Sequence, residues 1–300
     1  MISMRRLLVA ADGSASADQA ALFAGRLASR FGAKVDVISV VPKSSVIAAG
    51  WLGMVPEMAA TAFGTDSALE RAKRISQSAA SDAKRGGCRH VSWSVEIGDP
   101  ARTVVSVADG LNADAIVMGR RGTGNMSGLL LGSVSTKVSH LSERTVVTVR
   151  GEYREPIGRV LAAVDGSEHS LRAAQLAIAL CETYEAKLEL LHVVSMTAMV
   201  PFGLGGIDSF EYDRLEDSML ATAEQYLVRV QDLASAAGVE AVATVELGDP
   251  ATHIVLHAAN ADADLICVGR RGLGNVRGLL LGSVSHKVSH IAGQTVATVQ

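Results

Sequence analysis

The chain has 300 residues, of which 48% are hydrophobic and 20% charged, and its formal net charge at pH 7 is −3. This length predicts two domains of ordinary size, and the near-neutral charge argues against a nucleic acid as a partner. No apolar stretch approaches the roughly 20 residues of a membrane span, and the three cysteines follow no zinc-binding spacing. We therefore expect a cytoplasmic protein with no membrane partner and no metal site.

In the first half, short apolar runs alternate with segments of helical periodicity. The predicted strands are 6–11, 34–41, 91–97, 115–118 and 145–149. The predicted helices are 16–31, 67–85, 100–111 and 133–141, and the stretch 43–65 is predicted to be a loop. Gly32 is placed to end the first helix, and Pro100 suits the first turn of the third.

The second half repeats this order. Its predicted strands are 160–164, 187–194, 240–247, 265–268 and 295–299, and its predicted helices are 170–183, 212–237, 250–260 and 283–291, with a glycine-rich loop at 200–207. Asp12-Gly13-Ser14 recurs 153 residues later, and Gly98-Asp99-Pro100 recurs 150 residues later. The pattern indicates a duplicated α/β domain, the copies spanning 1–151 and 156–300, each with a parallel sheet between helices.

The most closely repeated segment is 119–140, which matches 269–290 at 18 of 22 positions. Its spacing in the first copy is Gly119-x2-Gly122-x9-Gly132-Ser133. This is neither a Walker A loop nor the dinucleotide fingerprint. Glycines let a backbone approach a ligand, the start of a helix offers free N–H groups, and Ser133 can cap that helix or donate to a phosphate oxygen. The spacing favours a phosphate site; the alternative, that the glycines only form tight turns, stays open.

The Asp-Gly-Ser turn and the glycine loop each follow a predicted strand. In parallel sheets, ligands bind at the carboxyl ends of the strands, near the point where the strand order reverses. We therefore expect the two segments to converge at one edge of each sheet.

These motifs resemble the universal stress protein family, in its tandem form with the G-2x-G-9x-G-Ser/Thr nucleotide motif. The resemblance covers nearly the whole chain twice, through the strand-Asp-Gly-Ser opening, the Gly-Asp-Pro turn and the GRRG…LLLGSVS block. It implies two tandem Rossmann-like domains of the adenine nucleotide alpha hydrolase-like type, each a five-stranded parallel sheet between helices. The chain lacks the Cys-Pro that many members have after the last helix, which bears on the last strand.

The resemblance implies ATP, with Mg²⁺ as an additional ion, bound at the strand ends of both halves. Asp12 and Asp165 would accept hydrogen bonds from the ribose hydroxyls. The adenine would be flanked by Ala10 and Val40, and by Ala163 and Val193. The phosphates would be held in the first half by Gly119, Arg121, Gly122, Gly124, Asn125, Gly132, Ser133, Val134 and Ser135. They would be held in the second half by Gly269, Arg271, Gly272, Gly274, Asn275, Gly282, Ser283, Val284 and Ser285. Whether the arginine pairs of these loops face phosphate or solvent stays open.

No nucleophile stands beside a base, and no carboxylate pair is placed for acid–base catalysis, so catalytic residues are not predicted. The expected function is that of an ATP-binding regulator or sensor in the stress response, with at most weak ATP hydrolysis. One alternative is a nucleotide-dependent enzyme, a slow ATPase or nucleotidyl transferase, using the loops at 43–65 and 195–210. The other is an interaction scaffold that binds no nucleotide.

The resemblance also implies a homodimer, or close packing of the two halves, through the last strands at 145–149 and 295–299, and unidentified protein partners. His253 and His257 share a helical face at i, i+4 spacing, which suits a metal ion. The first half has Thr103 and Val107 at those positions, and we therefore predict no metal there.

Overall fold

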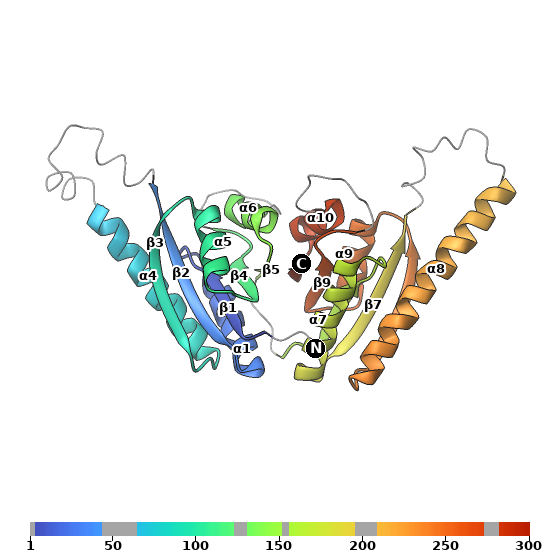
Figure 1. Ribbon diagram of the computed structural model, residues 1–300, viewed down its shortest axis with the longest axis horizontal. Coiled ribbons are helices and arrows are strands. Elements are labelled where there is room, and N and C mark those ends of the chain that lie inside the picture. Colours follow the sequence, from blue (N-terminus) through green and yellow to red (C-terminus); the bar gives the residue numbers. More distant parts are fainter. Residues whose placement is uncertain (1–3, 44–64, 123–130, 152–155, 196–208, 273–281) are drawn as a thin grey trace. The chain divides into compact units, whose positions relative to one another are not determined.

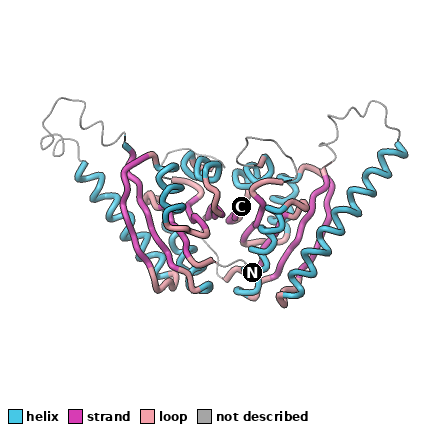
Figure 2. The backbone as a smooth tube through the Cα atoms, in the orientation of Figure 1, coloured by secondary structure: helices cyan, strands magenta, loops and turns pink. Residues whose placement is uncertain are grey.

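The computed structural model describes residues 4–43, 65–122, 131–151, 156–195, 209–272 and 282–300. The chain divides into two compact units with the boundary between Tyr153 and Arg154, and each unit is described by itself. Helices and strands alternate along each of them (Figure 2). Within the described residues, no helix is both long enough and apolar enough to cross a membrane.

The first unit contains, in chain order, β1 (Arg6–Ala10), α1 (Ala15–Phe31), β2 (Lys34–Pro42), α4 (Thr65–Arg85), β3 (Val91–Gly98), α5 (Pro100–Gly110), β4 (Ala115–Gly119), α6 (Ser133–Leu141) and β5 (Thr145–Val149). The second contains β6 (Arg159–Ala163), α7 (Glu168–Tyr184), β7 (Lys187–Val194), α8 (Ser209–Ala236), β8 (Ala241–Leu247), α9 (Pro250–Asn260), β9 (Leu265–Gly269), α10 (Ser283–Ile291) and β10 (Thr295–Val299). Every predicted helix and strand is confirmed, with bounds that agree within three residues. The predicted loops at 43–65 and 200–207 fall almost wholly outside the described residues.

Each unit is a parallel sheet covered on both faces. The strand orders are β3-β2-β1-β4-β5 and β8-β7-β6-β9-β10, and the pairs within each order run parallel. In the first unit α1 and α4 pack together on one face, and α5 and α6 pack together on the other (Figure 1). The second unit repeats this with α7 and α8 against α9 and α10. The predicted fold class, two tandem Rossmann-like α/β domains, is confirmed.

Aliphatic side chains form the core between the sheet and its helices. Leu8, Ile38 and Ile116 of the sheet pack with Val104 of α5 and Val138 of α6, all at most 2% exposed. In the second unit the corresponding cluster joins Leu161, Leu191 and Ile266 with Ile254 and Val288. Burial of such side chains contributes about 1.5–3 kcal/mol each, so the sheet is a rigid base for the loops at its edges.

The Gly-Asp-Pro turns are helix start signals. Asp99 accepts a hydrogen bond from the Arg102 N–H at 3.0 Å, and Pro100 occupies the first turn of α5. Asp249 caps α9 in the same way through the Thr252 N–H at 2.9 Å. A carboxylate at the helix N-terminus and a proline that needs no N–H there both favour initiation. This motif therefore belongs to the fold.

β1 is the point from which the strand order departs in both directions. The chain passes from β1 to β2 and β3 on one side, and then returns to β4 and β5 on the other. The loops that leave the carboxyl ends of β1 and β4 consequently begin at adjacent strands, as do those of β6 and β9. This is the switch point at which open α/β sheets bind their ligands.

Candidate functional site

A serine joins the two repeated motifs at the switch point. The Ser14 hydroxyl accepts a hydrogen bond from the Ala17 N–H at 3.2 Å, which caps α1, and it donates to the Arg121 carbonyl at 3.2 Å. Ser167 makes the same two contacts, with the Ser170 N–H and the Arg271 carbonyl, both at 3.1 Å. The expected convergence of the Asp-Gly-Ser turn and the glycine loop is therefore observed in both units. The contact that produces it was not foreseen, although the repeat of the serine was its signal.

The aspartate carboxylate is fixed against the glycine loop. Oδ1 of Asp12 accepts the Ser14 N–H at 3.0 Å, and Oδ2 lies so near Gly122 that a Cβ there would overlap it. Asp165 makes the same contacts with Ser167 and Gly272. A glycine at this position is thus what allows the carboxylate to stand beside the loop.

The first glycine of the motif has a different role. A Cβ on Gly119 would lie 2.6 Å from the Ser16 carbonyl carbon and 2.8 Å from the Ala17 nitrogen, both in the backbone of α1. A Cβ on Gly269 would lie 2.7 Å from the His169 carbonyl carbon and 2.7 Å from the Ser170 nitrogen. Gly119 therefore makes room for the first turn of a helix, and its contact with a ligand stays a prediction.

The far end of the loop is tied back to its beginning. The Arg120 carbonyl accepts the Gly132 N–H at 2.9 Å and the Ser135 hydroxyl at 3.1 Å. The Arg270 carbonyl accepts the Gly282 N–H at 2.8 Å and the Ser285 hydroxyl at 2.9 Å. The two ends of each glycine loop are thus closed over a helix N-terminus.

That N-terminus has backbone donors to offer. Gly132 is the N-cap, with φ −64° and ψ 153°, and Ser133 is the first residue of α6. The first helical hydrogen bond runs from the Thr136 N–H to the Gly132 carbonyl at 2.9 Å, so the N–H groups of residues 133–135 precede it. The suggestion that Ser133 caps this helix is wrong, and the Ser135 hydroxyl is used within the loop. The backbone N–H groups and the exposed Ser133 hydroxyl carry the phosphate-binding potential.

The two adjacent arginines of each loop differ in solvent exposure. Arg120 is 4% exposed and Arg121 is exposed, and Arg270 and Arg271 repeat this arrangement. Burial, together with the positive charges of Arg150 and Arg121, lowers the pKa of Arg120 to about 10. The arrangement concentrates positive charge beside the loop, which favours an anion there.

An apolar wall adjoins these polar groups. Ala10, Val40 and Val134 are half-buried and pack against the cluster that contains Val104 of α5. In the second unit the buried Ala163 and the half-buried Val193 and Val284 occupy the same places. The residues expected to flank adenine are thus brought together with a valine from the first turn of the phosphate-site helix. Four site residues, Gly124, Asn125, Gly274 and Asn275, lie outside the described residues.

Comparison with known proteins identifies the family of both units. The family model described as the universal stress protein family matches residues 4–150 and again 156–300. The chain belongs to the universal stress protein family.

Individual relatives support a tandem member. A universal stress protein of Mycolicibacterium smegmatis is 27% identical over 300 residues, which cover 98% of this chain and 96% of that protein. The Bacillus subtilis universal stress protein YxiE is 32% identical over 145 residues, or 47% of this chain and 98% of that protein. The crystal structure of a universal stress protein from Archaeoglobus fulgidus superposes with a TM-score of 0.71 at 22% identity, covering 99% of this chain and 97% of that chain. The last comparison shows the shared fold.

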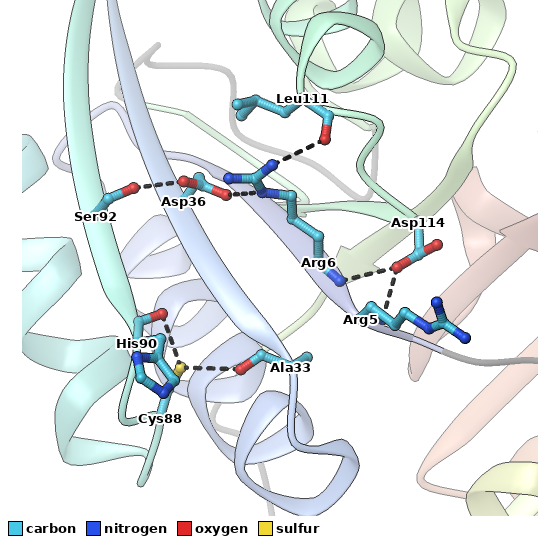
Figure 3. A network of polar contacts seen from close by, with 9 residues as sticks. All are labelled: Arg5, Arg6, Ala33, Asp36, Cys88, His90, Ser92, Leu111 and Asp114. Atoms are coloured by element: carbon cyan, nitrogen blue, oxygen red, sulfur yellow. Dashed lines mark hydrogen bonds and ion pairs between the residues drawn. The ribbon is translucent and has the colours of Figure 1, made fainter.

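The opposite, amino-terminal edge of this universal stress protein is occupied by internal contacts. Figure 3 shows the Arg6 guanidinium bonded to Asp36, with Nε to Oδ2 at 2.8 Å, while the Asp114 carboxylate accepts the Arg6 N–H at 2.8 Å. The Cys88 thiol lies 3.4 Å from the His90 carbonyl in the same region. In the second unit Arg159 pairs with Glu189 at the equivalent place, beside a cavity of about 510 Å³. These charges are matched within the fold, so the carboxyl edge is the better candidate site.

The two histidines of α9 share a carboxylate. The Nδ1 atoms of His253 and His257 lie 2.7 Å from Oε2 and Oε1 of Glu246 on β8. A Cβ on Gly248 would overlap Nε2 of His253, so the glycine backbone occupies the approach to that nitrogen. No group of three or more His, Cys, Asp or Glu side chains is placed to hold a metal ion in the part of the chain that the structure describes. The i, i+4 pair is best explained as a structural contact in which His253 and His257 of α9 hold Glu246 of β8, and we call this contact the Glu246 clasp.

We expect Glu246→Gln to lower the free energy of unfolding by about 1 kcal/mol at pH 7. Burial raises the pKa of Glu246, but the hydrogen bonds from His257 and His253 outweigh it and hold that pKa below its ordinary 4.5. A carboxylate whose pKa is lowered on folding adds stability above its unfolded pKa, and the contribution disappears as the pH falls through the folded value. Urea unfolding at pH 7 and at pH 4 measures the difference.

Glu96 on β3 is the matched control. It pairs with Val40 as Glu246 pairs with Val193, and it is exposed. The residues equivalent to His253 and His257 in the first unit are Thr103 and Val107. Glu96→Gln should leave the free energy of unfolding within about 0.5 kcal/mol of the wild-type value. An equal loss in both variants, or a loss from Glu246→Gln that persists unchanged at pH 4, would contradict the clasp.

Proposed function

We propose that each half binds an adenine nucleotide, with ATP as the physiological ligand, and that the protein is a nucleotide-dependent regulator or sensor in the stress response. The observation that carries this is the convergence, in two copies, of a fixed aspartate, a closed glycine loop and a helix N-terminus. Together they offer a hydrogen-bond acceptor for the ribose hydroxyls beside hydrogen-bond donors for the phosphate oxygens. The apolar wall of Ala10, Val40 and Val134 suits an adenine face.

The residues fit the ligand group by group. Asp12 accepts the Ser14 N–H through Oδ1 and places Oδ2 beside the glycine loop, where a carboxylate suits the hydroxyls of a ribose. The N–H groups of 133–135 and the exposed Arg121 favour the negative phosphates. Mg²⁺ would enter bound to those phosphates, since the ion prefers phosphate oxygens and water with one or two carboxylates. The second half offers the same set.

We infer that the protein is not an efficient enzyme. Described polar groups at the site are engaged in holding the loop, as Ser14 and Ser135 are, and none forms a pair of nucleophile and base. Nucleotide binding would instead shift the population of a surface that protein partners recognise. Any ATP hydrolysis supported by Asp12 or Asp165 should be slow.

We expect freshly purified protein, analysed by native mass spectrometry, to carry up to two adenine nucleotides per chain. Acid denaturation followed by chromatography identifies what is released. The same spectra report whether the protein is the homodimer inferred from the last strands. Protein that carries no nucleotide, and takes up none at millimolar ATP and Mg²⁺, would refute the proposed function and leave the scaffold alternative.

A further inference from the structure

The two candidate nucleotide sites differ in the side chains that pack beside their Asp-Gly-Ser turns. Ile38 pairs with Ala10, and Leu191 pairs with Ala163, so the next residues, Ser39 and His192, hold equivalent positions. Ser39 is 4% exposed, and its hydroxyl does not titrate in the physiological range. The second site thus has an imidazole where the first has a small neutral side chain.

A second substitution accompanies the first. A Cβ on Gly13 would touch Ile75 of α4 at 3.0 Å, whereas a Cβ on Gly166 would lie 2.8 Å from Cδ2 of Tyr226 on α8. Ile75 and Tyr226 therefore pack against the same glycine of the Asp-Gly-Ser turn. An aliphatic side chain in the first unit is replaced by an aromatic ring in the second.

In the second unit these replacements stack on each other. The rings of His192 and Tyr226 are nearly parallel, with an interplanar angle of 4° and centroids 6.3 Å apart. The adjoining aspartate is more covered than its counterpart, because Asp165 is half-buried and Asp12 is exposed. The His–Tyr pair therefore packs beside the turn that carries Asp165, the carboxylate that would accept the ribose.

Asp165 is the charged group that acts on His192. Burial lowers the pKa of His192 and the Asp165 carboxylate opposes this, leaving the pKa below its ordinary 6.5. From α8 the facing group is the Tyr226 ring. Glu246 of β8 turns to the other face of the sheet, where it is bonded to the two histidines of α9.

One more titratable group belongs to the second site. His169 occupies the place of Ser16 in the first turn of the helix that follows the Asp-Gly-Ser turn. Burial lowers its pKa first, and the charges of Arg172, Arg271 and Arg270 lower it further, while Glu168 raises it. His169 therefore responds to the glycine loop, and it serves as a control for His192.

We propose that the second nucleotide site loses affinity on acidification through protonation of His192, while the first site keeps its affinity. This inference rests on the proposed function. A neutral imidazole leaves the Asp165 carboxylate to accept the ribose hydroxyls. An imidazolium beside that carboxylate attracts it electrostatically and competes with the ribose for its oxygens. His192 is thus a positioning residue, and the two halves respond differently to pH.

The expected change is set by a single proton. Because the neutral form binds nucleotide better, affinity falls as the pH drops through the His192 pKa, by at most tenfold per pH unit. Because the pKa of His192 lies below 6.5, we expect a rise of up to about tenfold in Kd at the second site between pH 7.5 and pH 5.5. Phosphate protonation on the nucleotide affects both sites alike, and the first site is therefore the internal reference.

The experiment uses the full chain with one site silenced at a time. Gly122→Ala leaves the second site, and Gly272→Ala leaves the first. Equilibrium dialysis with ATP and Mg²⁺ at pH 7.5 and pH 5.5 gives Kd for each. His192→Ser, which installs the residue of the first half, is made in the Gly122→Ala chain, with His192→Asn as a second replacement should the serine variant fail to fold by circular dichroism. His169→Ser, in the same background, is the matched control.

The expected result is a larger rise in Kd at the second site than at the first, abolished by either His192 replacement and retained by His169→Ser. Equal pH dependence at the two sites, tighter binding at pH 5.5, or a dependence that follows His169 would overturn the inference alone. Wild-type protein that binds no nucleotide at pH 7.5 overturns the proposed function, and this inference with it.

Discussion

The double variant Gly122→Ala/Gly272→Ala should bind ATP about a hundredfold more weakly at both sites while remaining folded. A methyl group at either position would occupy the place of the Asp12 or Asp165 Oδ2 atom, so the carboxylate must rotate away. Loss of one or two hydrogen bonds to a charged acceptor is worth about 3 kcal/mol, which corresponds to that factor in Kd. Isothermal titration calorimetry with ATP and Mg²⁺ measures Kd and stoichiometry together.

The fold should tolerate these two substitutions. The atoms nearest to the added Cβ belong to an aspartate side chain, and Gly122 lies outside the left-handed region of backbone conformation. Gly110→Ala is the matched control, because a Cβ there meets nothing within 4 Å and the residue lies in the last turn of α5. It should bind ATP as the wild type does. Wild-type affinity in the double variant would show that the aspartates do not hold the ligand.

The architecture was predictable because each local signal agreed with the global fold. Apolar runs became strands that are buried except in β3 and β8, and Gly32 and Pro100 marked helix ends where the structure places them. The repeat added an independent check, since each element had to be found twice. A parallel sheet followed from strands that are apolar on both faces.

The site was predictable only as far as topology determines it. Asp12 and Gly122 each follow a strand, so their approach at one edge of the sheet could be expected from the strand order. The atoms that lie beside each glycine could not be predicted, because the sequence does not show which neighbouring group excludes a side chain at that position. Gly119 and Gly122 stand three residues apart in one motif, yet the neighbour is a helix backbone for the first and a carboxylate for the second.

The directions of the side chains at the end of β4 also could not be predicted from the sequence. Arg120 still follows the sheet ladder, with its N–H bonded to the Val149 carbonyl at 3.0 Å, and its side chain is buried. Arg121 has left the ladder and is exposed. Two adjacent arginines of identical chemistry are thus separated by where the strand ends, which composition and spacing do not give. The Glu246 clasp was hidden for a similar reason, since its partners come from a strand and a helix that the sequence alone does not bring face to face.

The largest loss of stability should follow Gly119→Ala, which we expect to lower the free energy of unfolding of the first unit by about 3 kcal/mol. The added Cβ would lie 2.6 Å from the Ser16 carbonyl carbon and 2.8 Å from the Ala17 nitrogen. Backbone atoms at the start of a helix cannot turn aside as a side chain does, so α1 must shift as a body. That helix buries Phe23 and Leu27, at 1% and 2% exposure, and the shift therefore spreads into the core.

The tryptophans make this loss measurable in one unit. Both of them, Trp51 and Trp93, lie in the first half, so their fluorescence reports on that half, whereas circular dichroism reports on both. A loss of about 3 kcal/mol should lower the urea midpoint seen by fluorescence by about 1–2 M. Gly122→Ala should move it far less, and Gly269→Ala, the same change in the second half, should act mainly on the circular dichroism. If Gly119→Ala and Gly122→Ala shift the fluorescence midpoint equally, the two glycines do not have the separate roles assigned to them, and the motif would have to be understood as a single turn.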